Sequence, residues 1–219
     1  PKQNTEVFRV TEDLHGNLWI ASSYQTIIFN PSKNTSHLLY LDPYKKTNCY
    51  NSPLHVTDDK KHYLMGGCGT YEIHFPLKHI DSTSVCPSKA IPVIEFSDNA
   101  DRNYFKLINK SEKFTELWTS NLKRYRIHDH SDNETQPKAE LIKQYSLNDG
   151  ICNIDVKEMI EDDKGRIWIS TEHGLACFFH ETESFHNFYI EDGLPTNKFY
   201  WGSYKDKYGK LYFCTTNGL

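Results

Sequence analysis

The feature that most constrains the fold is a motif that returns about every 45 residues along the chain. Its clearest copies, residues 12–22 and 161–171, align an acidic pair, a turn glycine and a tryptophan. A third copy at 205–215 has Tyr212 in the place of the tryptophan. Weaker copies begin at residues 57 and 111, so the five starting points are 45, 54, 50 and 44 residues apart. Such a period indicates a repeat architecture in which each copy is one supersecondary unit.

Two further features share this period. Residues 145–151 resemble residues 189–194, which lie 43 to 44 positions later, and the Gly-Leu pair at 174–175 returns at 218–219. Periods of this length are typical of the four-stranded blades of β-propellers. We therefore predict an all-β fold, a β-propeller of four-stranded antiparallel blades. About five blades are expected, near residues 5–45, 50–95, 96–145 and 146–190, with a partial blade at 191–219.

Each copy of the motif indicates short strands joined by tight turns. In the Asp-x-x-Gly segment, Asp favours the start of a turn and Gly supplies the positive φ that closes a hairpin. The runs around Trp19 and Trp168 are continuously apolar, which is typical of strands covered on both faces, as in stacked blades. The residues predicted to build the blades are the packing residues Trp19, Trp118, Trp168 and Tyr212 and the turn residues Gly16, Gly165 and Gly209. The polar stretches 76–90 and 128–138 are predicted to be loops, and no helix longer than about two turns is expected.

Composition and charge exclude several classes of function. Aromatic residues make up 14% of the chain and only two residues are Met, which suits sheets better than helix bundles. The formal net charge of −4 comes without a basic stripe, so we expect no binding of nucleic acid. No run of 18 apolar residues is present, so no membrane span is expected, and no signal peptide is visible. The six cysteines form no C-x-x-C pair, and we expect them to be small buried side chains, although disulfides stay open.

The sequence carries no recognisable catalytic or metal-binding signature. The densest group among the 11 histidines, at 128–130, lacks any supporting H-E-x-x-H motif or cysteine pair. We therefore predict neither a metal nor a cofactor. The carboxylate pairs at 58–59 and 162–163 lie in expected hairpin turns, so turn geometry explains them better than glycosidase chemistry does.

The residues match a family pattern. The sequence Glu-Asp-x-x-Gly-x-x-Trp-Ile-x-Thr-x-x-Gly-Leu, read over 161–175, resembles the two-component regulator propeller repeat. Residues 192–199 and the motif after them are similar to the last blades of such propellers. The similarity covers nearly the whole chain and is strongest at 7–30 and 145–219.

This resemblance implies a cellular context. In that family, which is typical of Bacteroides-type hybrid two-component sensors, two seven-bladed propellers lie in the periplasm. An immunoglobulin-like domain, a membrane helix, a histidine kinase and often a DNA-binding response regulator follow, and many members sense glycans. The chain is thus expected to be a periplasmic fragment of a seven-bladed propeller from an inner-membrane receptor. Its partners would be the remaining blades, the immunoglobulin-like domain and a second copy of the receptor in a homodimer.

Ligand sites in propellers gather where the turns between blades and the loops after the second strands meet. On those loops, the candidates to bind an oligosaccharide are Tyr24, Glu172, His173, Asn197 and Asn217, although turn geometry alone also explains Asn at such positions. The alternatives are a propeller enzyme, a lyase or hydrolase acting on carbohydrate, and a structural scaffold or dimerisation propeller. The loops offer mostly Asn, Gly, Ser and Thr rather than convergent acids, which favours a non-enzymatic sensor.

Overall fold

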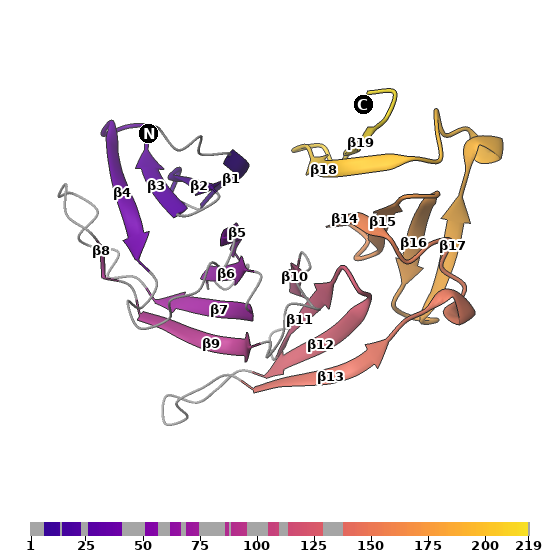
Figure 1. Cartoon of the computed structure of the whole chain (residues 1–219), viewed down its shortest axis with the longest axis horizontal. Coiled ribbons are helices and arrows are strands. Elements are labelled where there is room, and N and C mark those ends of the chain that lie inside the picture. Colours follow the sequence, from indigo (N-terminus) through magenta and orange to yellow (C-terminus); the bar gives the residue numbers. More distant parts are fainter. Residues whose placement is uncertain are drawn as a thin grey trace, which may run out of the picture. The chain divides into compact units, whose positions relative to one another are not determined.

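The computed structural model describes residues 7–13, 15–22, 26–40, 51–56, 62–66, 69–74, 86–87, 89–95, 105–109, 114–128 and 138–218, some of them by their backbone alone (Figure 1). The chain divides into two compact units. The first comprises Pro1–Asn109 and Ile127–Ala139, and the second comprises Lys110–Arg126 and Glu140–Leu219.

The first unit contains two sheets, and β8 lies in the sheet of β1–β4 rather than between β7 and β9. One has the order β1-β2-β3-β4-β8 and the other the order β5-β6-β7-β9. The strands of the former are β1 (Val7–Glu12), β2 (Leu18–Ser22), β3 (Thr26–Asn30), β4 (Thr35–Tyr40) and β8 (Cys86–Pro87). Those of the latter are β5 (Asn51–Val56), β6 (His62–Gly66), β7 (Gly69–His74) and β9 (Lys89–Glu95).

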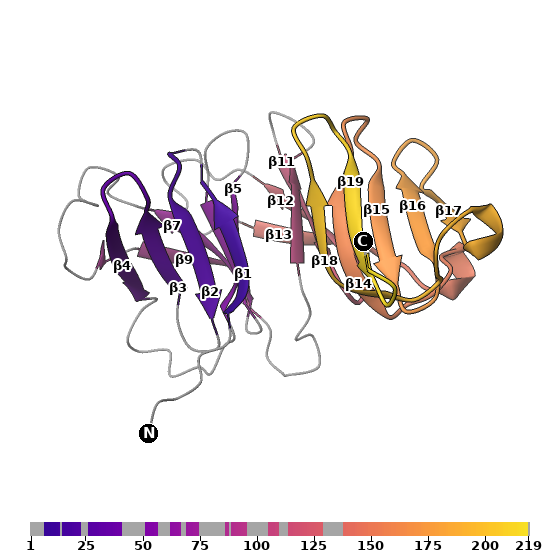
Figure 2. The ribbon, with the colours of Figure 1, turned by 90° about the horizontal axis from the view of Figure 1, so that it is seen from above.

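Three further sheets follow along the chain. One has the order β10-β11-β12-β13, with strands Phe105–Asn109, Phe114–Thr119, Lys123–His128 and Lys138–Gln144. The next has the order β14-β15-β16-β17, with strands Val156–Glu161, Ile167–Thr171, Leu175–Phe179 and Ser184–Phe188. The last pairs β18 (Phe199–Lys205) with β19 (Leu211–Thr215), and β18 lies against β14 and β15 (Figure 2).

These sheets confirm the predicted fold class of four-stranded antiparallel blades. In the described part of the chain, the helical segments are two single 3-10 turns, Leu147–Asp149 and Ile190–Asp192. The prediction of a loop through residues 76–90 was wrong at its end, because β8 and the start of β9 lie there. Strand β8 pairs with β4 at the edge of its sheet, where proline and polar residues are tolerated, so its sequence does not look like a strand.

A single carboxylate organises the turn of the β14-β15 hairpin. Oδ1 of Asp162 accepts hydrogen bonds from the backbone N–H groups of Lys164 and Arg166, at 2.9 and 3.0 Å. Its Oδ2 accepts one from the indole Nε1 of Trp168, at 2.9 Å. Gly165, with φ of 74°, closes the turn by donating its N–H to the carbonyl of Asp162. The motif therefore joins the turn and the packing residue through one side chain.

The same arrangement recurs in two other hairpins. The carboxylate of Asp13 accepts hydrogen bonds from the backbone N–H groups of His15 and Asn17, and a further one from Nε1 of Trp19. The carboxylate of Asp206 accepts hydrogen bonds from the backbone N–H groups of Tyr208 and Lys210, and a further one from the hydroxyl of Tyr212. Gly16 and Gly209 have φ of 77° and 80° in these turns. Tyrosine can replace tryptophan in the repeat because its hydroxyl also donates to the aspartate.

Burial alone would raise the pKa of Asp162, but its hydrogen bonds, led by that from Trp168, hold this pKa below its ordinary value.

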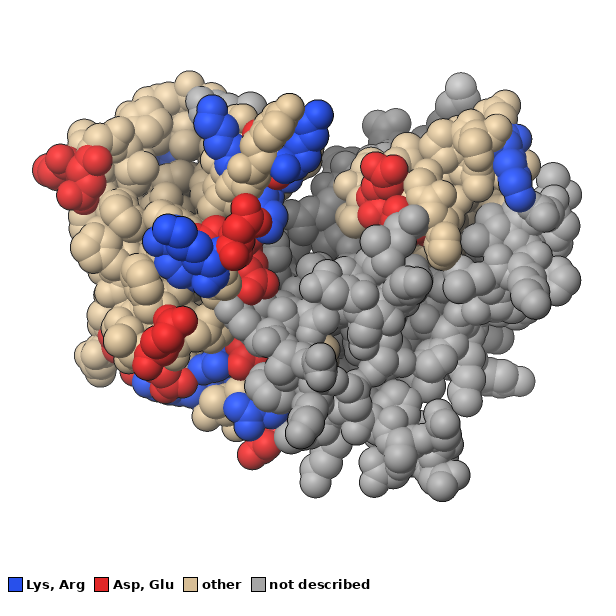
Figure 3. Space-filling model, turned by 180° about the vertical axis from the view of Figure 1, so that it is seen from behind, with Lys and Arg blue, Asp and Glu red and all other residues tan. Residues whose placement is uncertain are grey.

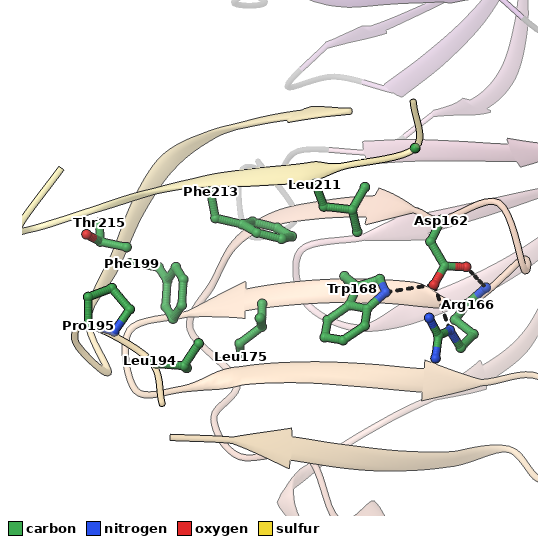
Figure 4. Close-up of a pocket in the computed structure, with 11 residues that line it drawn as sticks. Asp162, Arg166, Trp168, Leu175, Leu194, Pro195, Phe199, Leu211, Phe213 and Thr215 are labelled. Carbon is green, nitrogen blue, oxygen red and sulfur yellow. Dashed lines mark hydrogen bonds and ion pairs between the residues drawn. The ribbon is translucent and has the colours of Figure 1, made fainter. Parts of the chain in front are cut away.

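The three tryptophans predicted to pack between blades are buried to different degrees. Trp19 and Trp118 are buried, and Trp118 stacks on Tyr145 with ring centroids 5.2 Å apart. Phe178 of β16 meets the Trp118 ring edge-on at 5.0 Å. Trp168 is only partly buried, because it lines an open groove between its own blade and β19 (Figure 4). Trp168 is therefore less deeply buried than Trp19 and Trp118.

A buried ion pair holds the seam between β11–β12 and the next blade. Arg124 of β12 binds Glu116 of β11 with two hydrogen bonds, Nη2 to Oε1 at 2.6 Å and Nε to Oε2 at 3.1 Å. Its Nη1 donates to Glu183, in the β16-β17 turn, at 2.7 Å. The guanidinium also lies 5.9 Å from the ring centroids of Trp118 and Phe178. This one cation thus links side chains of two neighbouring blades.

We expect Asp162→Ala to lower the free energy of unfolding by about 2–3 kcal/mol, because two amides and an indole N–H lose their acceptor. The adjacent Asp163 is a matched control, since its carboxylate is exposed and pairs with Lys205 on the surface. Asp163→Ala should change stability by less than about 0.5 kcal/mol. Urea denaturation measures both, and equal losses would refute the role of Asp162.

Arg124→Met should cost about 3–5 kcal/mol, because it leaves the buried carboxylate of Glu116 without its cation. The double variant Arg124→Met/Glu116→Leu should recover much of this loss, since both charges are then absent. Urea denaturation of the variants, analysed as a double-mutant cycle, measures the coupling. Additive effects of the two changes would contradict a direct pair.

Candidate functional site

The candidate site lies at the end of the second unit where the inner strands begin. Backbone hydrogen bonds hold its loops together. The N–H of Glu172, just after β15, donates to the carbonyl of Asp155, just before β14, at 2.9 Å. The N–H of Gly174 donates to the carbonyl of Asn197 at 2.7 Å. The loops before β14, after β15 and before β18 therefore form one connected surface.

An ion cluster occupies this surface. The carboxylate of Glu172 bridges two lysines, with Lys157 Nζ at 2.8 Å from Oε2 and Lys198 Nζ at 2.6 Å from Oε1. Lys157 also binds Asp155 Oδ1 at 3.0 Å. Its ammonium lies 5.7 Å from the ring centroid of Trp201, which is 49% exposed. Lys157 thus connects a cluster of alternating charges to an accessible aromatic ring.

Irregular strand pairing near the start of β14 and β18 sets the directions of the Lys157 and Trp201 side chains. In β14, Val156 pairs with Thr171 and Glu158 pairs with Ser170, which leaves Lys157 as an extra residue in a bulge. In β18 the register shifts between Phe199 and Ser203, so Trp201 also lies in an irregular segment, beside Gly202 with φ of 126°. Bulges re-aim side chains and are common beside functional sites.

The two lysines set the charge state of the cluster. Hydrogen bonds from Lys157 and then Lys198 lower the pKa of Glu172 to about 2. The partnership with Glu172 likewise raises the pKa of both lysines. All three groups are therefore charged over the physiological pH range. Acidic and basic side chains also lie interspersed over the described part of the face in Figure 3, rather than in patches of one sign.

This arrangement can hold a polar ligand by stacking and by hydrogen bonds. An exposed indole ring offers an apolar platform, and the neighbouring ammonium and carboxylate groups offer donors and acceptors. Among the described residues, no group of three His, Cys, Asp or Glu side chains could hold a metal ion. Burial raises the pKa of the Cys177 thiol to about 11, so this thiol stays protonated at neutral pH.

The structure brings four of the five predicted ligand residues to this end of the second unit. Glu172 is part of the ion cluster, and His173 is exposed, with its ring 6.0 Å from that of Tyr189. The side-chain oxygen of Asn197 accepts a hydrogen bond from the backbone of Ile190. Asn217 donates from Nδ2 to the carbonyl of Pro195 at 3.4 Å. The two asparagines thus hold loop geometry, and Tyr24 lies outside the described residues.

Sequence reasoning missed Lys157, Lys198 and Trp201. One signal was available for Trp201, because it is the one tryptophan of the four that does not fall at the repeat position. The lysines carry no such signal, since their pairing with Glu172 depends on a bulge and on contact between blades. The histidine group at 128–130 and the pair at 58–59 lie outside the residues whose side chains are described.

Comparison with known proteins supports the fold but not a family. No protein-family model matches the chain, and no curated protein matches its sequence. Among solved structures, the chain is similar to the extracellular domain of the hybrid two-component system BT4673 from B. thetaiotaomicron, with a TM-score of 0.69 and 10% identity. That match covers 98% of this chain and 29% of the other, so the chain spans less than a third of that protein's length.

Two other neighbours show the range of functions on this fold. The extracellular domain of the hybrid two-component system BT3049 from B. thetaiotaomicron aligns with a TM-score of 0.57 at 16% identity, over 97% of this chain and 33% of that one. Virginiamycin B lyase from Staphylococcus aureus aligns with a TM-score of 0.59 at 11% identity, over 98% of this chain and 71% of the lyase chain. At these identities the likeness establishes a propeller-type fold alone.

In the described part of the chain, no helix is long and apolar enough to cross a membrane.

We expect the Glu172 carboxyl carbon to titrate at about pH 2 in an NMR experiment. Because this pKa is depressed, the contribution of the cluster is complete above the ordinary value of 4.5 and is lost as the pH falls towards 2. Lys198→Gln should move the midpoint upwards, since it removes one of the two cations. A midpoint near 4.5 in both proteins would show that the ion cluster does not form in solution.

Proposed function

We propose that this chain is a ligand-sensing propeller segment from the periplasmic part of a hybrid two-component sensor, and that its ligand is a glycan. The observation that carries the proposal is the exposed Trp201 ring beside Lys157, Glu172 and Lys198. Sugar rings combine an apolar face with hydroxyl groups, so they match an aromatic platform bordered by charged hydrogen-bonding groups. The likeness in fold to two sensor extracellular domains points in the same direction.

In this proposal the chain binds its ligand and catalyses no reaction. Binding would favour one arrangement of the propeller, and the receptor would pass that change to a histidine kinase elsewhere in the parent. The remaining blades, an immunoglobulin-like domain and a second receptor copy would be its partners. A ligand can shift such an equilibrium only by its difference in affinity for the two states.

A propeller lyase or hydrolase is the second candidate, and the likeness in fold to virginiamycin B lyase favours it. Such an enzyme needs a general acid or base whose pKa suits proton transfer near neutral pH. The acid of the cluster, Glu172, instead has its pKa lowered to about 2, which suits a permanent charge. We therefore place the sensor first. A scaffold without a ligand is the third candidate, and the experiment below separates all three.

We expect one or more members of an oligosaccharide panel to raise the melting temperature of the chain without being consumed. Trp201→Ala should weaken that binding at least about tenfold, because it removes the stacking surface. Tyr208→Ala is the matched control, since Tyr208 is 80% exposed and lies in the turn at the other end of β18. Isothermal titration calorimetry measures the affinities.

The enzyme and the scaffold predict different results with the same oligosaccharides. Turnover that is abolished by one substitution in the cluster would establish an enzyme. No thermal shift with any glycan would favour the scaffold. Equal losses from Trp201→Ala and Tyr208→Ala would show that the binding site lies elsewhere.

A further inference from the structure

The hydrogen-bonding groups of the ion cluster are not equally occupied. An ammonium group has three N–H donors, and an ionised carboxylate has acceptors only. Both oxygens of Glu172 are in use, because Oε2 faces Lys157 at 2.8 Å and Oε1 faces Lys198 at 2.6 Å. Lys157 in turn binds Asp155 at 3.0 Å and lies 5.7 Å from the ring centroid of Trp201, within range of a cation–π attraction. Glu172 and Lys157 are therefore already engaged within the protein.

Lys198 is the open cation of the cluster. Its side chain is 50% exposed, whereas that of Lys157 is 12% exposed. Among the described residues, Glu172 is the one side chain that binds the Lys198 ammonium, so two of its three N–H donors remain available to a ligand. Two backbone bonds hold Lys198 in place, since its N–H donates to Thr196 Oγ1 at 3.2 Å and its carbonyl accepts from Thr216 N–H at 3.3 Å. A fixed backbone thus presents an ammonium group with free donors.

Positive charge is in excess around Lys198. Two cations, Lys157 and Lys198, share the single anion Glu172, and all three groups are charged at neutral pH. The fourth member of the cluster, Asp155, pairs with Lys157, and its side chain is 59% exposed, so water screens its charge. An anionic group that approaches Lys198 is therefore attracted.

The Glu172–Lys198 pair can open for such an anion at little cost. The two side chains are 35% and 50% exposed, and ion pairs between exposed side chains are weak. If Lys198 turns towards a ligand, Glu172 keeps its bond to Lys157, so the carboxylate retains a cation. The cluster can thus exchange one anionic partner of Lys198 for another.

The open cation and the aromatic platform belong to one short segment. Lys198 directly precedes β18, and Trp201 lies three residues later, in the part of β18 where the register shifts. Lys157 connects the two, because it faces the Trp201 ring and shares Glu172 with Lys198. A sugar ring that stacks on Trp201 and carries an anionic group at its edge would therefore engage both the indole and the free ammonium donors.

We propose that the ligand of this site is an acidic glycan, whose carboxylate or sulfate group binds Lys198 while its sugar ring stacks on Trp201. The inference rests on the proposed function, because it names the class of glycan that the same site binds. Lys198 is then the residue that selects an acidic sugar over a neutral one, since charge-assisted hydrogen bonds are stronger than those to a hydroxyl group. Trp201 contributes affinity for both kinds of sugar.

The test compares acidic oligosaccharides with neutral counterparts of the same backbone. Oligosaccharides of galacturonate, glucuronate and mannuronate are measured beside their carboxyl-reduced forms, and sulfated oligosaccharides beside their desulfated forms, by isothermal titration calorimetry. At least one acidic member should bind at least about fivefold more tightly than its neutral counterpart at low salt. This preference should shrink at high salt, because it depends on charge. Its loss on carboxyl reduction identifies a carboxylate, and its loss on desulfation identifies a sulfate.

Three variants of the full chain assign the preference to one residue. Lys198→Gln should reduce it to less than about twofold, because the open cation is removed. Lys198→Arg should keep it, since the charge is retained. Lys205→Gln is the matched control, because Lys205 is the last residue of β18 and forms an exposed ion pair with Asp163 at 3.0 Å. This control should leave the preference unchanged.

The failure of this inference can be told apart from that of the proposed function. Equal affinity for every acidic oligosaccharide and its neutral counterpart, with binding still weakened by Trp201→Ala, would overturn the inference and leave the glycan sensor standing. A preference that Lys198→Gln does not change, or that Lys205→Gln removes equally, would also overturn it. Binding of no oligosaccharide would contradict both proposals.

Discussion

The rest of the structure depends on the bond between the turn aspartate and the aromatic residue six positions later. Asp13, Asp162 and Asp206 each tie down two turn amides and the polar atom of a Trp or Tyr ring. The ring is thereby fixed where the next blade packs. Burial alone would raise the pKa of each carboxylate, but the hydrogen bonds outweigh this effect and lower it. In these three hairpins, one side chain thus couples hairpin formation to blade stacking.

This coupling explains why the fold could be predicted from the sequence. The spacing of Asp, Gly and the aromatic residue is local, and it predicts both the hairpin and the covered face of its strand. The partial exposure of Trp168 could not be predicted in the same way, because it depends on which strands lie across the seam. The short edge strand β8 was missed because its two residues, Cys86 and Pro87, carry no pattern of their own.

The candidate site was harder to predict because its geometry depends on departures from the repeat. Glu172 was found, since it follows the second strand of a blade, where propeller loops gather. Lys157 and Trp201 were missed because irregular pairing at the start of their strands, rather than the regular alternation, directs their side chains. The regular blades thus form a scaffold, and the residues with the proposed binding role lie where the strand pairing is irregular.

The most direct test of the central interaction is a ¹H–¹⁵N NMR titration of the four tryptophan indole groups towards low pH. The indole signals of Trp19 and Trp168 should move as their aspartates are protonated, with midpoints below the ordinary aspartate value of 3.8. The signal of Trp118, whose Nε1 has no hydrogen-bond partner among the described residues, should not follow them. If Trp19 and Trp168 stay unchanged while the chain remains folded, or if Trp118 moves with them, the carboxylate–indole bond does not organise the blades.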